Sequence, residues 1–299
     1  MKQSIVHGMA MVLLMLMASC NAPRPDATEV DLSEGNVSRD QILQGQALRV
    51  AVATVISPRE SFSYYRDMFN ALSVYLDMPI EFKQRNTYEE VNELLAQNLV
   101  DIAFICSGAY ITGADHMELL VVPVIHGLPY YRGYIIVNEA SPYERFEDLE
   151  GRRFTHSDPL CFTGKLFVDM RLSAMGTHAD DFFEEVVYSL SHDVSIQMVS
   201  RHVIDGAAVN GLIYEYLAAK DPDMVAGLRI IEKTAYGGMP PVVNSLLMSR
   251  ELQDEIRGFF TSMHESPETR QILDQLLIDQ FLVVGDTLYD GLRKIRESI

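Results

Sequence analysis

Short β-rich apolar runs alternate along this chain with amphipathic stretches of helical length, and this alternation restricts the fold more than any other sequence feature. The first run, LRVAVATVI at 48–56, shows no helical period and is typical of a strand buried on both faces. Further strands are predicted at 80–84 and 100–106, and helices at 64–76 and 88–99. Thr87 and Glu90 form a capping-box pattern at the start of the second helix. Strands that alternate with helices predict βαβ units and a parallel-rich sheet.

A second alternation of the same kind predicts a second lobe. We interpret the extended runs at 118–126 and 130–138 as the crossing between lobes, and 242–248 as the crossing back. The remaining expected strands lie at 152–158, 186–190, 205–211 and 228–235, and the helices at 164–175, 195–203, 212–219, 250–264, 268–278 and 287–297. The sequence therefore predicts an α/β protein with two Rossmann-like lobes joined by two crossing segments. Lobe 1 would comprise 47–133 and 240–299, and lobe 2 would comprise 134–239.

Residues 1–20 are organised like a secretory signal peptide, with Lys2 before an apolar run at 9–17 and small residues leading to Cys20. The segment MLMASC resembles the lipobox of bacterial lipoproteins, which implies cleavage before Cys20 and its lipidation. The alternative is an ordinary cleaved signal in which Cys20 has no role. Residues 21–46 are acidic and proline-containing, and are predicted to be a flexible tether. The expected location is extracytoplasmic, in the periplasm or at the cell surface, with a lipid anchor in the membrane.

The formal net charge of -18 argues against nucleic-acid binding, because phosphate backbones are held by clustered Lys and Arg. An anionic ligand would have to be held by local donors and helix N-termini. The chain contains no P-loop, HExxH or GxSxG motif, so we expect a protein that is not an enzyme and needs no cofactor or metal. The rival enzyme hypothesis would pair Cys106 or Cys161 with His156 or His192 as nucleophile and base.

Several segments together resemble the phosphate, phosphite and phosphonate binding proteins of bacterial ABC importers. They are VDIAFICSGAYI, PVIHGLPYYRGYIIV, FEDLEGRRFTHSDPLCFTG, SHDVSIQMVSRHVIDGAAVNGLIYEYL and MPPVVNSLLM. The resemblance implies the periplasmic binding protein type 2 (Venus flytrap) fold. It also implies a monomer that captures a small anionic solute, such as phosphonate, phosphite or phosphate, by cleft closure. The membrane partner would be an ABC permease or, in the alternative, a sensor kinase that uses the protein as a ligand-sensing module.

The resemblance also places the candidate ligand-binding residues in the cleft between lobes. They are Tyr64, Tyr65, Cys106, Ser107, Tyr110, Cys161, Phe162, Thr163, Gly164, His192, Asp193 and Asn210. Thr163 and Gly164 open a helix, with Lys165 as a nearby charge, and Thr163 could equally be a simple cap. Tyr130 and Tyr131 are further aromatic candidates, and Arg132 is interpreted as a hinge residue.

Two departures from the family pattern affect the ligand. The loop that usually reads Ser-Thr-Ser-Gly here reads Cys161-Phe162-Thr163-Gly164, and an Asp common in the family is replaced by Asn210. Cys106 and Cys161 would face the cleft from opposite lobes. They could bind a soft species such as arsenite, close into a disulfide, or serve only as small buried apolar groups.

Overall fold

The computed structural model of the protein describes residues 47–53 and 58–299, without the side chains of 58–64. Within these residues, six strands form a first sheet in the order β13-β4-β12-β3-β1-β2. Their bounds are β1 Leu48–Ala53, β2 Ile80–Arg85, β3 Ile102–Phe104, β4 Met117–Val124, β12 Val242–Ser245 and β13 Gln280–Leu282. β1 pairs in parallel with β2 and β3, whereas β12 and β13 run antiparallel to their neighbours. The last strands of the chain thus return to the sheet that its first strands form.

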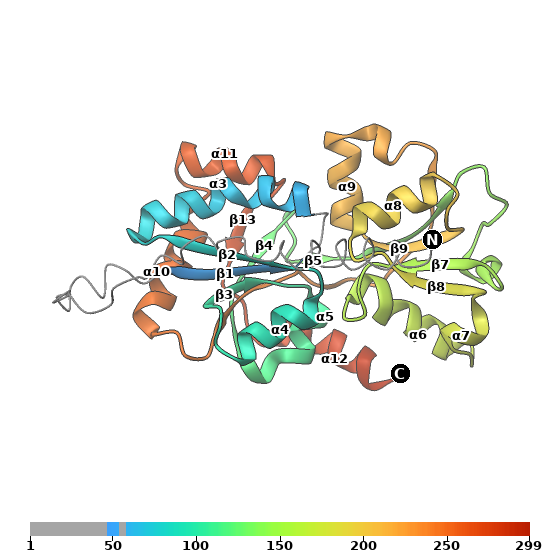
Figure 1. The fold of residues 1–299 in the computed structure, drawn as a ribbon, viewed down its shortest axis with the longest axis horizontal. Helices are drawn as coiled ribbons and strands as arrows, with labels where there is room; N and C mark the ends of the chain where they lie inside the picture. The colour runs from blue at the N-terminus through green and yellow to red at the C-terminus, as the bar shows by residue number, and fades with distance from the viewer. Residues whose placement is uncertain (1–46, 54–57) are drawn as a thin grey trace, which may run out of the picture. The chain divides into compact units, whose positions relative to one another are not determined.

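Alternate residues of β1 are buried on opposite faces of this sheet, as its uninterrupted apolar sequence predicts. Val50 and Val52 pack with Met68 on one face, and Ala51 packs with Val91 on the other. The first face is covered by α3 (Pro58–Leu76), α10 (Arg250–Ser262) and α11 (Pro267–Gln275). The second is covered by α4 (Tyr88–Ala96), α5 (Ser107–Gly113) and α12 (Asp290–Glu297). Figure 1 shows α3 and α11 on one side of the sheet and α4 and α5 on the other.

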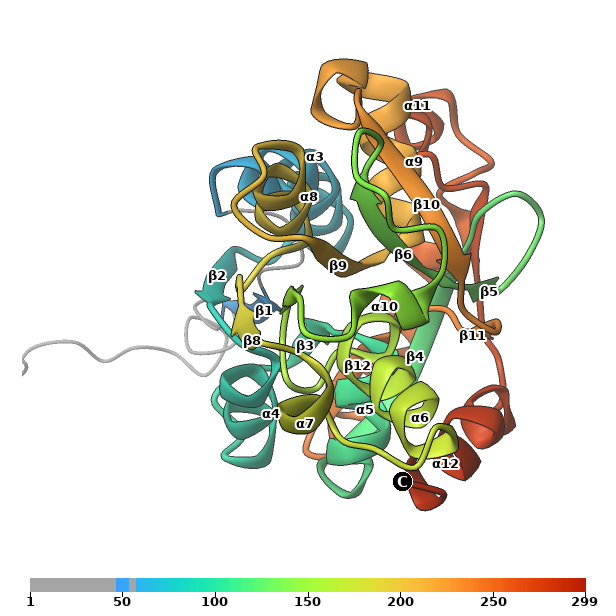
Figure 2. The same ribbon diagram turned by 90° about the vertical axis from the view of Figure 1, so that its right-hand side faces the viewer.

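A second sheet has the order β10-β6-β9-β7-β8. Its strands are β6 (Gly133–Asn138), β7 (Arg153–His156), β8 (Glu185–Tyr188), β9 (Gly206–Asn210) and β10 (Leu228–Lys233). Ile135 and Val137 pack towards α6 (Phe167–Ala174) and α7 (Ala179–Phe182). Tyr134 and Ile136 pack towards α8 (His192–Ser200) and α9 (Gly211–Lys220). The second sheet is therefore also covered by helices on both faces (Figure 2).

The chain passes between the sheets twice, and the two passages lie side by side. It leaves β4 at Val124 and enters β6 at Gly133, and it returns between β10 and β12. Within these passages β5 (Tyr130–Tyr131) pairs antiparallel with β11 (Gly237–Gly238). The lobe boundaries predicted at 133/134 and 239/240 stay predictions.

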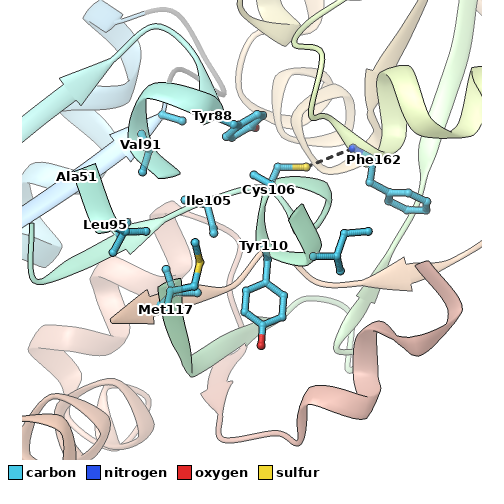
Figure 3. Packing of buried hydrophobic residues seen from close by; sticks show 14 of the residues in the cluster. Ala51, Tyr88, Val91, Leu95, Ile105, Cys106, Tyr110, Met117 and Phe162 are labelled. Atoms are coloured by element: carbon cyan, nitrogen blue, oxygen red, sulfur yellow. Dashed lines mark hydrogen bonds between the residues drawn. The ribbon is translucent and has the colours of Figure 1, made fainter. Parts of the chain in front are cut away.

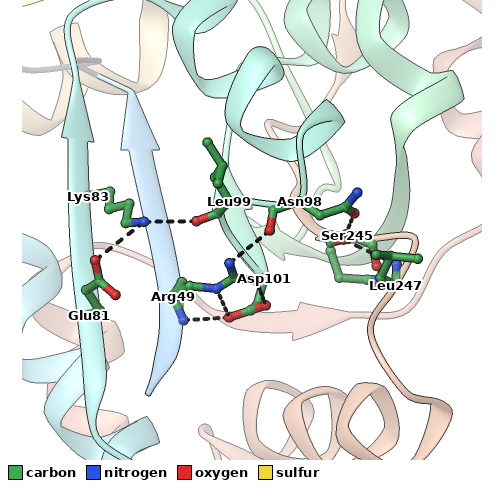
Figure 4. A network of polar contacts seen from close by, with 9 residues as sticks. Arg49, Glu81, Lys83, Asn98, Leu99, Asp101, Ser245 and Leu247 are labelled. Carbon is green, nitrogen blue, oxygen red and sulfur yellow. Dashed lines mark hydrogen bonds and ion pairs between the residues drawn. The ribbon is translucent and has the colours of Figure 1, made fainter. Parts of the chain in front are cut away.

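A partly buried ion pair links the strands β1 and β3 at their amino-terminal ends. The Arg49 guanidinium donates to Asp101 at 2.6 and 3.0 Å and to the Asn98 carbonyl at 2.8 Å (Figure 4). Asp101 also accepts the Arg49 backbone N–H at 2.7 Å. These bonds fix the turn after α4 against β1, because a two-pronged guanidinium–carboxylate contact defines direction as well as distance.

Several predicted elements differ in extent from the observed ones. The helix expected at 64–76 begins at Pro58, a residue well suited to a first helical turn. The helix expected at 195–203 spans His192–Ser200, so His192 lies in its first turn. The helix expected from 164 begins as a π-helical turn at Phe162–Leu166, and β13 and α7 were not predicted. The signal peptide, Cys20, the tether, the end of the first strand at 54–56 and the Tyr64 side chain lie outside the described residues.

In the part of the chain that the structure describes, no helix combines the length and apolarity needed to cross a membrane.

The capping box predicted at α4 is present. Thr87 Oγ1 accepts the Glu90 N–H at 3.2 Å, and the Glu90 carboxylate accepts the Thr87 N–H at 3.0 Å. We predict that Thr87→Ala lowers the free energy of unfolding by about 1 kcal/mol, because one helix-end donor loses its partner. Thr87→Ser, which keeps the hydroxyl, should stay close to the wild type. Chemical denaturation measures both, and equal losses in the two variants would contradict the assignment.

Candidate ligand site

The carboxyl ends of two parallel strands, one in each sheet, bring the candidate residues together. β3 is followed by Ile105 and Cys106, and Cys106 is the N-cap residue of α5. β7 is followed by a loop that ends at Cys161, the N-cap residue of the π-helical turn η3 (Phe162–Leu166). Open α/β sheets place ligand sites at such strand ends. Figure 3 shows the Cys106 sulfur directed at the Phe162 amide.

The Cys106 side chain makes the contact between the two segments. Its sulfur lies 3.4 Å from the Phe162 amide nitrogen and 3.6 Å from the Tyr131 hydroxyl. Tyr131 also bonds Ser107 Oγ at 2.8 Å. The approach is possible because residue 108 is glycine: a β-carbon there would lie 2.2 Å from the Leu160 carbonyl oxygen.

Polar groups from the second sheet continue this contact. Cys161 Sγ lies 3.4 Å from Thr163 Oγ1 and 3.7 Å from His192 Nε2, which is 3.2 Å from Ser157 Oγ. The Asn210 backbone N–H donates to His192 Nδ1 at 3.1 Å. The neutral ring therefore carries its proton on Nε2.

We call this set of buried groups the thiol cluster. It comprises Cys106, Ser107, Tyr131, Ser157, Cys161, the Phe162 amide, Thr163 and His192. This set contains no carboxylate and no Lys or Arg side chain. It therefore offers only hydroxyl, thiol, imidazole and amide donors.

Burial and hydrogen bonding shift the acidity of the two thiols in opposite directions. Burial alone would raise the pKa of Cys106, but hydrogen bonds from Cys161, the Phe162 amide and Tyr131 outweigh it and lower the pKa to about 6. The hydrogen bond to Cys106, together with burial, raises the pKa of Cys161 well above its ordinary value.

A carboxylate makes a second contact between the segments. Asp158 Oδ2 accepts the Tyr88 N–H, at the start of α4, at 3.0 Å, and Oδ1 accepts the Leu160 N–H at 2.7 Å. Burial raises the pKa of Asp158, although these two N–H groups act against the rise. Two contacts, one through Asp158 and one through Cys106, thus hold the loop after β7 against the first sheet.

An apolar cavity of about 150 Å³ lies beside the thiol cluster. Ile105 and Asn210 line it, and these residues adjoin Cys106 and His192 respectively. The rest of its wall is mostly apolar and includes Tyr65, Met68, Phe104, Pro123, Leu212, Ile213, Pro240 and Phe281. Its charged residue is Glu215, which accepts a hydrogen bond from the Tyr134 hydroxyl and lies 3.7 Å from His126 Nε2.

The structure brings together most of the predicted site residues. Cys106, Ser107, Cys161, Phe162, Thr163 and His192 belong to the thiol cluster, Gly164 adjoins Cys161, and Tyr65 and Asn210 line the cavity. Asp193 lies buried beside His192 in the first turn of α8. Tyr110 instead donates its hydroxyl to Asp286 at 2.7 Å and packs its ring on Tyr289.

Two expectations about side-chain roles need correction, those for Thr163 and Lys165. Thr163 does not cap a helix, because Cys161 is the N-cap residue and Thr163 lies inside the π turn. Lys165 is paired with Asp169 and supplies no free charge to the cluster. Asn210 Oδ1 accepts the Leu212 N–H at 2.8 Å and so caps α9. Arg132 lies over the Tyr236 ring, 4.8 Å from its centroid, beside the returning passage.

Sequence reasoning missed the roles of Ser157, Asp158 and Tyr88. A signal existed for Asp158, since an Asp directly after a buried strand and before Pro159 can accept amides of a turn. Its partner on α4, Tyr88, is 70 positions away in the sequence. No local pattern predicts such a pairing.

The geometry gives no support to a Cys–His nucleophile. His192 Nε2 carries the proton and cannot accept one from Cys161, whose own pKa is raised. Both ring nitrogens of His156 lack a hydrogen-bond partner in the described structure. Among the described residues, no group of three or more His, Cys, Asp and Glu side chains could hold a metal ion.

A family model described as the periplasmic substrate-binding protein of phosphonate ABC transporters matches residues 50–289. The chain belongs to this family. The phosphonates-binding periplasmic protein of Escherichia coli (strain K12) is 26% identical over 154 residues, which span 50% of this chain and 45% of that protein. The aligned part therefore covers less than half of that relative.

Solved structures of the family share the fold. A binding-protein component of an ABC phosphonate transporter from Pseudomonas aeruginosa has a TM-score of 0.80 at 21% identity, covering 84% of this chain and 86% of its own. A Prochlorococcus marinus (MIT 9301) protein in complex with methylphosphonate has a TM-score of 0.76 at 15% identity, covering 84% and 97%. The predicted two-lobed periplasmic binding protein type 2 fold is thus confirmed.

Burial of the neutral imidazoles predicts a loss of stability in acid. The pKa values of His192 and His156 are lowered to about 3, chiefly by burial. The unfolded chain therefore binds more protons below about pH 6.5, and stability present above that pH is lost as the pH falls towards 3. Each histidine contributes up to about 1.4 kcal/mol per pH unit.

The slope of the free energy of unfolding against pH reports how many protons the chain takes up on unfolding. We predict that His192→Asn lowers this number by about one between pH 6 and pH 5. Urea denaturation at several pH values measures the slope for the variant and for the wild type. Identical slopes for His192→Asn and the wild type would show that the His192 pKa is not depressed.

Proposed function

We propose that this protein is the extracytoplasmic solute-binding component of an ABC importer and captures a phosphonate with a compact apolar substituent. Family membership over residues 50–289 supports the class of protein. The observation that carries the ligand class is the junction of the thiol cluster with the apolar cavity. One part suits an oxyanion and the other suits a hydrocarbon group.

The oxyanion would be held by neutral donors. The Phe162 amide, at the start of the helix that η3 and α6 form together, already donates to sulfur across the contact. The Tyr131 hydroxyl lies beside the Cys106 sulfur and contacts Ser107 Oγ, and the Thr163 hydroxyl lies beside the Cys161 sulfur. Amides and hydroxyls at a helix N-terminus suit phosphorus oxyanions, and a bound oxygen would replace the Cys106 sulfur as acceptor.

The substituent would enter the apolar cavity. A cavity of about 150 Å³ matches the size that takes up a benzene ring. The wall offers an ammonium group one carboxylate, Glu215, which also accepts from Tyr134, and is otherwise mostly apolar. The wall therefore favours alkyl- and arylphosphonates over aminoalkylphosphonates.

The ligand would touch both lobes, 47–133 with 240–299 and 134–239, and would favour their closed arrangement. The closed form would then dock on an ABC permease in the membrane. Lipidation at Cys20 and the tether at 21–46 would hold the protein beside that partner as a monomer. A sensor kinase as the partner is the alternative, and the genetic neighbours of the protein would distinguish the two.

Isothermal titration of the reduced full chain tests the ligand class. We predict that phenylphosphonate binds at least about tenfold more tightly than methylphosphonate, since burying several apolar carbons contributes more than about 1.4 kcal/mol. 2-Aminoethylphosphonate should bind more weakly than ethylphosphonate. Binding of no phosphonate at all would contradict the proposed function.

Ile213→Trp provides the matched variant, because it adds volume to the cavity wall away from the thiol cluster. It should lower the affinity for phenylphosphonate to that for methylphosphonate and leave methylphosphonate binding unchanged. An equal loss for both ligands would place the substituent elsewhere.

A further inference from the structure

Cys106 and Cys161 are the free cysteines among the described residues, and they come from different sheets. They are 2% and 0% exposed. Each follows the carboxyl end of a strand and stands at the N-cap position of the next helical segment. The proximity of the two cysteines therefore depends on the contact between the segments that follow β3 and β7.

The separation of the two residues suits a covalent bond. Cys106 Sγ lies 3.4 Å from the Phe162 nitrogen, and two bonds of standard length join that nitrogen to the Cys161 α-carbon. The Cys106 sulfur is thus within about 6 Å of that α-carbon, so the two cysteines are spatial neighbours although they lie far apart in the sequence. Gly108, which admits the Leu160 carbonyl, keeps this approach free of a steric barrier.

The two thiols are chemically unequal in the way that disulfide exchange requires. Hydrogen bonds from Cys161, the Phe162 amide and Tyr131 outweigh burial and lower the pKa of Cys106, so it supplies the attacking thiolate. Cys161 keeps its proton, since its pKa is raised, and it lies against Cys106 as the resolving thiol.

We infer that Cys106 and Cys161 form a reversible disulfide that joins the two sheets and holds the segments after β3 and β7 together. The bond would close the site without a ligand, because it fixes the Cys106 sulfur where the Phe162 amide is already engaged. Reduction would restore a site that opens. The protein would thus bind its solute only in the dithiol form.

The oxidant is a small-molecule disulfide, RSSR. The Cys106 thiolate attacks one of its sulfurs and releases RS⁻, which leaves a mixed disulfide on Cys106. Cys161 then loses its proton and attacks the Cys106 sulfur, which releases the second RS⁻. Cys106 has already released its proton to solvent in forming the thiolate, and Cys161 releases the second; two protein thiols are thus oxidised, one RSSR is reduced, and the two RS⁻ take up the two protons as RSH.

Both thiols are buried, so exchange requires the segments to separate first. Oxidation of the native protein should therefore be slow compared with that of an exposed thiol and should quicken under conditions that open the contact. Once formed, the bond would trap the closed arrangement.

The test uses the full chain treated with oxidised glutathione, followed by blocking of free thiols and peptide mapping by mass spectrometry. The expected result is a linked Cys106–Cys161 peptide pair, with a mass loss of about 2 Da. An unfolding midpoint raised by several degrees should accompany it and return to the starting value with dithiothreitol. Thiols at both positions that remain unlinked, while the treated protein still unfolds at the reduced midpoint, would overturn the inference.

Cys161→Ser and Cys106→Ser should each abolish the linked pair and the rise in midpoint, and Cys20→Ser should leave both intact. If either site variant fails to fold, the wild-type mapping alone decides, since it depends on no substitution. A link from Cys20 to either thiol in place of the predicted pair would also overturn the inference.

Ligand titration separates this inference from the proposed function. Oxidised protein should lose phenylphosphonate binding by at least tenfold, and dithiothreitol should restore it. Absence of binding in the reduced protein, with the linked pair present, would contradict the proposed function alone. Binding that oxidation leaves unchanged, with the linked pair present, would contradict the closing role of the bond.

Discussion

The hydrogen bond from the Phe162 amide to the Cys106 sulfur joins the segment after β3 to the segment after β7, and the site depends on it. It forms because Gly108 presents no β-carbon to the Leu160 carbonyl, so two backbones from different sheets can meet. A second hydrogen bond, from the Tyr88 amide to the Asp158 carboxylate, also joins the first sheet to the segment after β7. Without these bonds, the thiol cluster would separate into two unrelated loop ends.

The electrostatics of the thiol cluster fit the anionic ligand that we propose for this acidic protein. The chain carries a formal net charge of -18. The cluster contains amide, hydroxyl and imidazole donors, and the nearby Lys165 is paired with Asp169. Neutral donors at a helix N-terminus bind an oxyanion by direction and proximity. In the proposed complex, a ligand oxygen would replace the Cys106 sulfur as acceptor of the Phe162 amide.

Much of the fold could be predicted from the sequence, because strand and helix periods are local. The uninterrupted apolar run of β1 and the Thr87–Glu90 capping box gave the correct elements. The π turn at Phe162 was not predictable, since it depends on the Cys161 carbonyl accepting from both Lys165 and Leu166.

The site was predicted mainly through family resemblance. The contact between Tyr88 and Asp158 was missed because it joins segments that are distant in the sequence. Tyr110 lies outside the thiol cluster because its hydroxyl donates to Asp286.

Hydrogen exchange of two backbone amides tests this account most directly. In the reduced, ligand-free protein, the amides of Phe162 and Tyr88 should both be protected, because each donates to a side chain from the other segment. Gly108→Val should remove both protections together and leave the amide of Ala207, inside the second sheet, unchanged. Exchange of Phe162 in the wild type as fast as that of an exposed amide would contradict the account.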